Sequence, residues 1–152
     1  MSAKRAFAVV KKYATANLPL PKRQTAFSAG YDLAAAETMT VPPGEIALVP
    51  TAFKAYIPPG EVLKIYARSS LAVKKHLMLP NSVGVIDADY VDNEQNEGQI
   101  FVALYNFGKE SARIEKGERI AQGIFEKFYA VDGDEVGNGT PREGGFGSTG
   151  EQ

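Results

Sequence analysis

The chain has 152 residues, a formal net charge of −1 and no cysteine. Its 17 basic and 18 acidic residues are scattered along the sequence, which excludes a basic face for duplex nucleic acid and a polybasic patch for membranes. The lack of cysteine excludes disulfides and thiolate metal sites, and the single histidine disfavours a histidine-rich metal centre. No apolar run forms a signal peptide or reaches membrane-spanning length, so we expect an intracellular, cytoplasmic protein, or one in the host cytoplasm if the source is viral.

Short apolar stretches rich in β-branched and aromatic residues, separated by Pro/Gly turns, predict strands rather than helices. Two Pro-Pro-Gly-Glu turns, at residues 42–45 and 58–61, separate several of them. The candidate strands cover residues 7–10, 46–49, 52–57, 62–67, 99–107 and 120–129. This spacing predicts an all-β protein, a jelly-roll-like barrel or sandwich.

Two segments depart from the strand pattern. Residues 69–76 begin with serines and end with basic side chains, which predicts one short helix. From residue 131 onward the composition becomes glycine-rich, with Phe146 as the one aromatic residue. We therefore expect a single β-rich domain over residues 1–130 and a mobile tail over residues 131–152.

Three local patterns carry possible chemistry. Arg68-Ser69-Ser70, where a strand becomes a helix, fits either an anion site or an ordinary helix cap with a surface arginine. Asp87 and Asp89 alternate with apolar residues and should share one face if the segment is an extended strand, which fits a general base or an exposed strand with solvated carboxylates. Gln122 is a polar residue inside an apolar strand. Taken singly, none of these patterns distinguishes a functional site from an ordinary structural feature.

Taken in order along the chain, five segments form a more specific pattern. They are AGYDLAA at 29–35, ARSSLA at 67–72, NSVGVIDADY at 81–90, GERIAQ at 117–122 and GGFGSTG at 144–150. These segments resemble, in order, the five motifs of homotrimeric dUTPases, and the likeness runs from about residue 20 to the end. The resemblance implies a jelly-roll subunit, a homotrimer with active sites shared between subunits, and Mg²⁺-dependent hydrolysis of dUTP to dUMP and pyrophosphate. That reaction keeps uracil out of DNA and supplies dUMP for thymidylate synthesis.

The resemblance also implies roles in catalysis and phosphate binding. Asp87 matches the carboxylate that orients and deprotonates the attacking water. The residues that would contact phosphates are Arg68, Ser69, Ser70 and Gln122. In this family the triphosphate and water hold Mg²⁺, so no direct protein ligand is expected, and Asp32 is assigned to the second shell.

Further roles concern the base, the sugar and the tail. Residues 81–90 look like the uracil-reading hairpin, in which main-chain groups pair with the base edge and Tyr90 packs under the deoxyribose. The base-binding residues are Asn81, Gly84, Val85, Ile86 and, on the returning strand, Phe101. Similar tails close over the nucleotide, with Phe146 on uracil and Gly147, Ser148 and Thr149 at the phosphates.

The chain departs from the family pattern at two places. Arg142 lies four positions before Phe146 rather than five, which changes the geometry of its γ-phosphate contact. The polar run 92–97 lengthens the hairpin by about six residues relative to the usual short turn. We interpret this run as a surface loop; a partner-binding feature is the alternative.

Two other functions compete with dUTP hydrolysis. A dCTP deaminase shares the fold, but a glutamate is expected at its base-activating position. A non-catalytic nucleotide-sensing protein on the same scaffold is the alternative from another class, because fold alone does not fix function. Asp87 and the complete tail motif favour the hydrolase.

Overall fold

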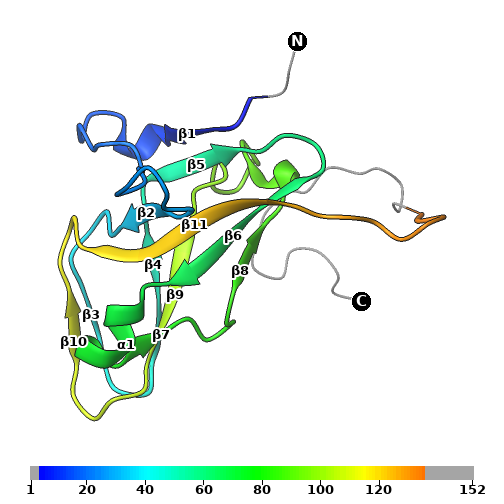
Figure 1. Cartoon of the computed structure of the whole chain (residues 1–152). Coiled ribbons are helices and arrows are strands. Elements are labelled where there is room, and N and C mark those ends of the chain that lie inside the picture. The colour runs from blue at the N-terminus through cyan, green and yellow to red at the C-terminus, as the bar shows by residue number, and fades with distance from the viewer. Residues whose placement is uncertain (1–3, 136–152) are drawn as a thin grey trace.

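The computed structural model describes residues 4–135, which form strands, one short α-helix and two 3₁₀ turns (Figure 1). The elements are β1 (Ala6–Val9), η1 (Lys11–Tyr13), β2 (Tyr31–Ala34), β3 (Met39–Val41), β4 (Ile46–Pro50), β5 (Phe53–Tyr56), β6 (Glu61–Ala67), α1 (Ser69–Lys75), β7 (Leu77–Met78), β8 (Gly84–Ile86), η2 (Ala88–Tyr90), β9 (Phe101–Asn106), β10 (Ala112–Ile114) and β11 (Arg119–Lys127). The predicted all-β, jelly-roll-like class with one short helix is confirmed. None of the helices within residues 4–135 is long and apolar enough to cross a membrane.

Four small sheets make up the part of the chain between residues 4 and 135. The largest has the strand order β2-β11-β6-β8, and a second has the order β4-β9-β7. Two-stranded ladders join β1 to β5 and β10 to β3. Within the largest sheet, β11 pairs antiparallel with β6 from Ala121↔Ala67 to Lys127↔Glu61. As a result β2 and β8 form its opposite edges (Figure 1).

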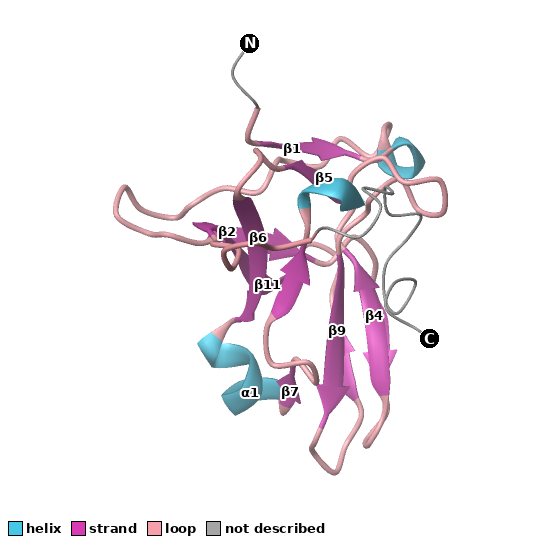
Figure 2. Ribbon diagram, turned by 90° about the vertical axis from the view of Figure 1, so that its right-hand side faces the viewer, coloured by secondary structure: helices cyan, strands magenta, loops and turns pink. Residues whose placement is uncertain are grey.

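The core lies between these sheets because their strands turn alternate side chains inward. In β9 the inward positions are Val102, Leu104 and Asn106, each at most 1% exposed. The other face of the β4-β9-β7 sheet keeps Ile46, Leu48 and Met78 between 41 and 58% exposed. Figure 2 shows β4 and β9 side by side. This sheet therefore has one face on the core and one apolar face toward solvent.

The strands predicted from the sequence are all present, with ends shifted by a few residues. The short strands β2, β3, β7 and β10 were not predicted, and β8 lies inside the expected hairpin 81–90. Strands of two to four residues have few alternating positions, so their pattern differs little from that of a loop. β1 and β5 are as short, but each lies in a mostly apolar run of the sequence.

The helix forms where expected, but its serines do not cap it. Arg68 occupies the N-cap with extended backbone and no side-chain cap hydrogen bond, so Ser69 and Ser70 already belong to the first turn. The one residue between β6 and α1 is Arg68, and both serines follow it. At the other end His76 adopts φ 56°, and its N–H donates to the Ala72 carbonyl at 3.1 Å.

Candidate active site

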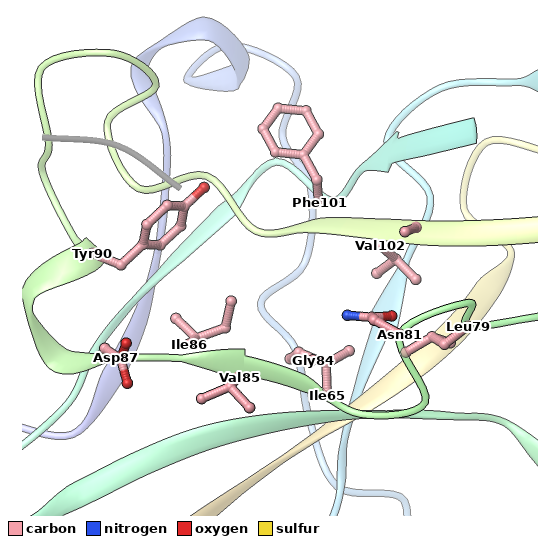
Figure 3. Close-up of a pocket in the computed structure, with 11 residues that line it drawn as sticks. Ile65, Leu79, Asn81, Gly84, Val85, Ile86, Asp87, Tyr90, Phe101 and Val102 are labelled. Carbon is pink, nitrogen blue, oxygen red and sulfur yellow. The ribbon is translucent and has the colours of Figure 1, made fainter. Parts of the chain in front are cut away.

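A cavity of about 190 Å³ lies between β8 and β9. Drug-sized ligands occupy pockets of about 300–1,000 Å³, so this cavity suits one flat ring rather than a whole nucleotide. It is lined by Ile65, Leu79, Asn81, Gly84, Val85, Ile86, Asp87, Tyr90, Phe101, Val102 and Ala103. Figure 3 shows Tyr90 and Asp87 at one end and Asn81 at the other. The structure thus gathers every described residue that the sequence assigned to the base and sugar, together with Asp87.

The two arms of the expected hairpin belong to different sheets. β8 pairs with β6, whereas β9 pairs with β4 and β7. Residues 81–90 and 101–106 are therefore not the two strands of one ladder, which corrects the sequence-based expectation. In Figure 3 the ring of Phe101 points away from β8, so β9 turns its main chain toward the cavity at this level. The separation of the two strands creates the space between them.

Asp87 and Asp89 do not share a strand face, contrary to the alternation in the sequence. β8 ends at Ile86, and Asp87 is the N-cap of the 3₁₀ turn Ala88–Tyr90. The Tyr90 N–H donates to the Asp87 carbonyl at 3.1 Å, which closes this turn. Asp87 is half-buried and lines the cavity, while Asp89 is exposed and is not among the described lining residues. The turn thus separates the two carboxylates.

A second, polar cleft lies at the β2 edge of the largest sheet. It is lined by Gln24, Ser28, Gly30, Asp32, Arg68, Ser69, Arg119 and Gln122. Asp32 and Gln122 are cross-strand partners on β2 and β11, so their side chains stand next to each other. Two guanidinium groups against one carboxylate make the cleft suitable for an anion.

The two arginines of this cleft contact a carboxylate and a backbone carbonyl within it. Arg119 Nη1 lies 3.4 Å from Asp32 Oδ2. Arg68 Nη1 donates to the backbone carbonyl of Arg119 at 3.4 Å, and both arginines line the cleft. Ser69 is exposed at the cleft, whereas Ser70 is half-buried and is not among its described lining residues.

Gly30 lies against the side chain of Gln122. A Cβ built on Gly30 would lie 2.3 Å from Gln122 Oε1 and 3.1 Å from Gln122 Cβ. The side-chain amide of Gln122 therefore rests directly on the backbone of Gly30. Any larger residue at position 30 would displace that amide.

Arg119 is a cleft residue that sequence reasoning did not single out. In a regular strand, residues three apart face opposite sides, so Arg119 and Gln122 should diverge. The pairing of β11 with β2 shifts register between Arg119 and Ala121. This bulge turns Arg119 onto the side of Gln122. Arg119 belongs to the GERIAQ segment, so the motif could have drawn attention to it. The bulge that turns its side chain toward Gln122 is not visible in the sequence.

The remaining predicted site residues lie outside the described part of the chain. They are Arg142, Phe146, Gly147, Ser148 and Thr149. Among the residues from 4 to 135, the ring-sized cavity and the polar cleft have no lining residue in common. They belong to opposite edges of the largest sheet, β8 and β2 (Figure 1).

The fold and these two sites define a β-jelly-roll protein with one cavity suited to a flat ring and one cleft suited to an anion. A protein-family model described as dUTPase matches residues 16–150. The chain belongs to the dUTPase family.

Individual relatives agree with this assignment. The chain is 56% identical to the deoxyuridine 5'-triphosphate nucleotidohydrolase of Lactococcus lactis, over 96% of this chain and 97% of that protein. It is also similar to the crystal structure of dUTPase from Streptococcus mutans, with a TM-score of 0.81 and 50% identity, covering 85% of this chain and 100% of the other. A point variant of the dUTPase of phage phi11 of S. aureus, described with a structural Mg(II) ion, shares the fold at 22% identity, with a TM-score of 0.70 over 88% of this chain and 97% of the other.

Proposed function

We propose that this chain hydrolyses dUTP to dUMP and pyrophosphate, with Asp87 activating the water that attacks the α-phosphate. The observation that carries the proposal is the position of Asp87 at one end of the ring-sized cavity, directly after β8 (Figure 3). A carboxylate can accept a proton from water when it is held beside the reacting phosphorus. The reaction removes dUTP that would place uracil in DNA and supplies dUMP for thymidylate synthesis.

The small cavity supports selection of uracil. Main-chain groups of β8 and of the start of β9 flank it, which suits pairing with the edge of a base. A close-fitting wall leaves no space for the methyl group of thymine, and fixed donors and acceptors mismatch the amine of cytosine. Asn81 and Gly84, at the end away from Tyr90, complete the proposed base site.

The sugar is assigned to Tyr90. Its side chain is buried, with 4% of the residue exposed, and it forms one end of the cavity. A rigid aromatic ring under the deoxyribose would clash with a ribose 2′-hydroxyl. Discrimination between dUTP and UTP is the expected consequence.

The polar cleft is assigned to the triphosphate. Arg68 and Gln122 would donate to phosphate oxygens, with Ser69 and Ser70 at the first turn of α1. Arg119 adds a second guanidinium that the sequence reasoning did not include. Phosphoryl transfer depends on such positioning and charge stabilisation rather than on covalent help.

Mg²⁺ is proposed to enter with the triphosphate. When bound, it neutralises charge on the phosphate oxygens. Mg²⁺ commonly keeps several waters and contacts one or two carboxylates besides substrate phosphates. Asp32 lines the same cleft as Arg68 and Gln122, which supports contacts between its carboxylate and the water molecules that Mg²⁺ would keep.

In the proposed chemical step, the proton transfer and the exchange of bonds involve Asp87, the substrate and one water. Asp87 accepts a proton from the water, whose oxygen forms a bond to the α-phosphorus. The bond between that phosphorus and the α–β bridging oxygen breaks, and pyrophosphate leaves with the electron pair. Arg68 and Gln122 would hold the charged oxygens in place during this exchange.

A homotrimer with shared sites is supported by two features. The cavity and the cleft lie at opposite edges of one sheet, so a neighbouring copy can bring one next to the other. The exposed face of the β4-β9-β7 sheet carries Ile46, Leu48 and Met78, an apolar surface that a second copy would cover.

The chain is proposed to consist of a domain over residues 1–130 and a tail over residues 131–152 that closes over the site and adds contacts to the substrate. Phe128 and Tyr129, which follow β11, are 53% and 89% exposed. The described chain beyond β11 extends away from the sheets (Figure 1). The proposed tail contacts are Phe146 on uracil, Gly147, Ser148 and Thr149 at the phosphates, and Arg142 at the γ-phosphate.

Pyrophosphate release from dUTP, UTP, dTTP and dCTP with Mg²⁺ tests the proposal. We expect selective turnover of dUTP and a decrease in kcat of about 10²–10⁴ in Asp87→Asn, with dUTP binding retained. Asp89→Asn is the matched control, since this carboxylate is exposed, and it should change kcat by less than a few-fold. Ammonia release from dCTP would instead identify a deaminase, and dUTP binding without turnover in the wild type would identify a nucleotide-sensing protein.

A further inference from the structure

The polar run after Tyr90 forms a compact turn over residues 92–98, which we call the 92–98 turn. Asn93 is buried, at 8% exposed, and its Oδ1 accepts from the N–H groups of Gln95 and Asn96 at 2.9 and 3.0 Å. Asp92 N–H donates to the Glu97 carbonyl at 2.9 Å. Asp92, Glu94 and Gln95 are exposed, so the turn lies at the surface, while the side chain of Asn93 hydrogen-bonds its backbone.

The 92–98 turn closes on Tyr90, the residue assigned to the sugar. Tyr90 Oη donates to the Gln99 carbonyl at 2.6 Å and accepts from Asn96 Nδ2 at 2.9 Å. Asn93 Nδ2 donates to the Tyr90 carbonyl at 2.7 Å. The phenol tip and the backbone of Tyr90 are thus both held by side chains of the turn.

The orientation of the Asn96 amide follows from its other contacts. Its Oδ1 accepts from Asn93 Nδ2 at 2.8 Å and from Gly98 N–H at 3.0 Å. Because two donors face the oxygen, the NH₂ end must be the one that points at the Tyr90 hydroxyl. The two asparagines and the phenol therefore form one connected hydrogen-bond network.

The backbone of the turn packs directly on the residues around Tyr90. Gly98 has φ +84°, and an added Cβ would lie 2.7 Å from Val91 Cα and 2.9 Å from the Tyr90 carbonyl oxygen. Asp92 and Glu97 also adopt positive φ, at 58° and 62°. Such conformations persist only where the surroundings hold them.

Ion pairs and hydrogen bonds to neighbouring elements stabilise this conformation of the 92–98 turn. Lys54 Nζ, on β5, contacts Asp92 Oδ1 at 2.5 Å and Glu97 Oε2 at 2.7 Å. Tyr56 Oη donates to Asp92 Oδ2 at 3.0 Å, and Lys11 N–H donates to Glu97 Oε1 at 2.9 Å. The turn is therefore fixed near both of its ends, to β5 and to the backbone of Lys11 in η1.

We propose that the 92–98 turn is a clamp that positions the Tyr90 ring, and that Asn96 is a positioning residue for discrimination against the ribose 2′-hydroxyl. The proposal rests on the proposed function, in which Tyr90 packs under the deoxyribose. A ring anchored only at Cβ can rotate and tilt to accommodate one extra oxygen. A ring also anchored at its hydroxyl and at its own carbonyl presents a fixed surface, and close packing then rejects the larger sugar.

The first test measures kcat/KM for dUTP and for UTP in the wild type, Asn96→Ala and Gln95→Ala. Gln95 is exposed in the same turn and serves as the matched control. We expect the ratio of the two kcat/KM values to fall about tenfold in Asn96→Ala, mainly through faster turnover of UTP, and to remain unchanged in Gln95→Ala. An unchanged ratio in Asn96→Ala would overturn the proposal, whether or not both activities fall. Partial loss of folding lowers both activities by the same factor and therefore leaves the ratio unchanged.

A double-mutant cycle with Tyr90→Phe tests the proposed route through the hydroxyl. Removing the hydroxyl should reduce the dUTP/UTP ratio to a similar extent, and Asn96→Ala should have little further effect in that background. Additive losses would show that Asn96 acts through something other than Tyr90 and would overturn the clamp.

The rate of Tyr90 ring flipping, measured by NMR on tyrosine-labelled protein, separates this proposal from the proposed function. The flip should be slow in the wild type and in Gln95→Ala, and at least tenfold faster in Asn96→Ala. Wild-type protein without dUTP turnover would refute the proposed function, while this change in flip rate would still support the clamp. Equal flip rates in all three proteins would overturn the clamp even in an active dUTPase.

Discussion

The guanidinium of Arg119 and the carboxylate of Asp32 lie 3.4 Å apart in the polar cleft, on strands whose register shifts between Arg119 and Ala121. Without that shift, Arg119 would face the side opposite to Gln122. The bulge therefore adds a second guanidinium to the proposed triphosphate site, and its contribution to substrate binding can be measured.

Arg119→Met should weaken triphosphate binding. Loss of one charge-assisted contact in the cleft is expected to raise KM for dUTP by about tenfold or more, with a smaller change in kcat. Steady-state kinetics and competition by inorganic triphosphate measure both values. Arg113→Met is the control, because that arginine is 64% exposed and pairs with Glu115 away from the cleft. Equal effects of the two substitutions would mean that only the overall charge matters.

Gly30→Ala should displace the Gln122 amide without unfolding the protein. The added Cβ would meet the far end of a flexible side chain at 2.3 Å, so the side chain moves rather than the backbone. The expected result is an increase in KM for dUTP of about two- to tenfold, the value of one hydrogen bond. In a Gln122→Ala background the same substitution should have no further effect; an independent loss there would contradict this explanation.

Lys54→Met should reduce the acid sensitivity of folding. Hydrogen bonds from Lys54 are the largest cause that lowers the pKa of both Asp92 and Glu97 below their ordinary values of 3.8 and 4.5. Their stabilisation is therefore complete above about pH 5 and is lost as the pH falls through the lowered pKa values. In Lys54→Met the free energy of unfolding should be lower by about 1 kcal/mol at pH 7 and should fall less steeply below pH 5.

Denaturant titrations between pH 3 and 7 measure this dependence. Burial by itself lowers the pKa of Lys54, but its hydrogen bonds to Asp92 and Glu97 raise it above the ordinary range, so the lysine stays charged throughout this window. Lys64→Met is the control, since that lysine is 40% exposed and contacts the single carboxylate of Glu126. A steeper acid limb in Lys54→Met would contradict the assignment.

Leu48→Glu should prevent trimer formation. Leu48 lies on the exposed face of the β4-β9-β7 sheet, opposite Ala103 in the register, and is 47% exposed in the single chain. A carboxylate buried against an apolar partner surface is strongly unfavourable. Sedimentation at micromolar concentration should show a trimer for the wild type and for Val73→Glu, whose site on α1 is 80% exposed, but a monomer for Leu48→Glu. A trimeric Leu48→Glu protein would exclude this face as the interface.

Much of the fold could be predicted from the sequence because long strands show regular alternation. The segments around residues 62–67, 101–106 and 119–127 have enough apolar positions for the pattern to be visible. The helix after Arg68 was also predictable from its serine start and basic end, although the serines proved to lie inside the first turn. Family membership followed from the order of short motifs, which no single motif could have established.

Other features depended on contacts between segments far apart in the chain. Alternation predicted that Asp87 and Asp89 share a face, but the 3₁₀ turn Ala88–Tyr90 separates them. The hairpin expected around residues 81–90 is divided, since β8 pairs with β6 and β9 with β4 and β7. Strand pairing depends on which strand edges meet in three dimensions. The local alternation of apolar and polar residues does not specify the partner strand.

By itself, the sequence determined the all-β class, the order of the motifs and the residue types available for binding a base and a triphosphate. Only the tertiary structure decided that Arg119 joins Gln122 in one cleft and that Asn96 reaches the hydroxyl of Tyr90. The physical reason is that composition and periodicity are properties of neighbouring residues. A bulge, a buried amide network and a cavity between two sheets arise only when distant segments pack together.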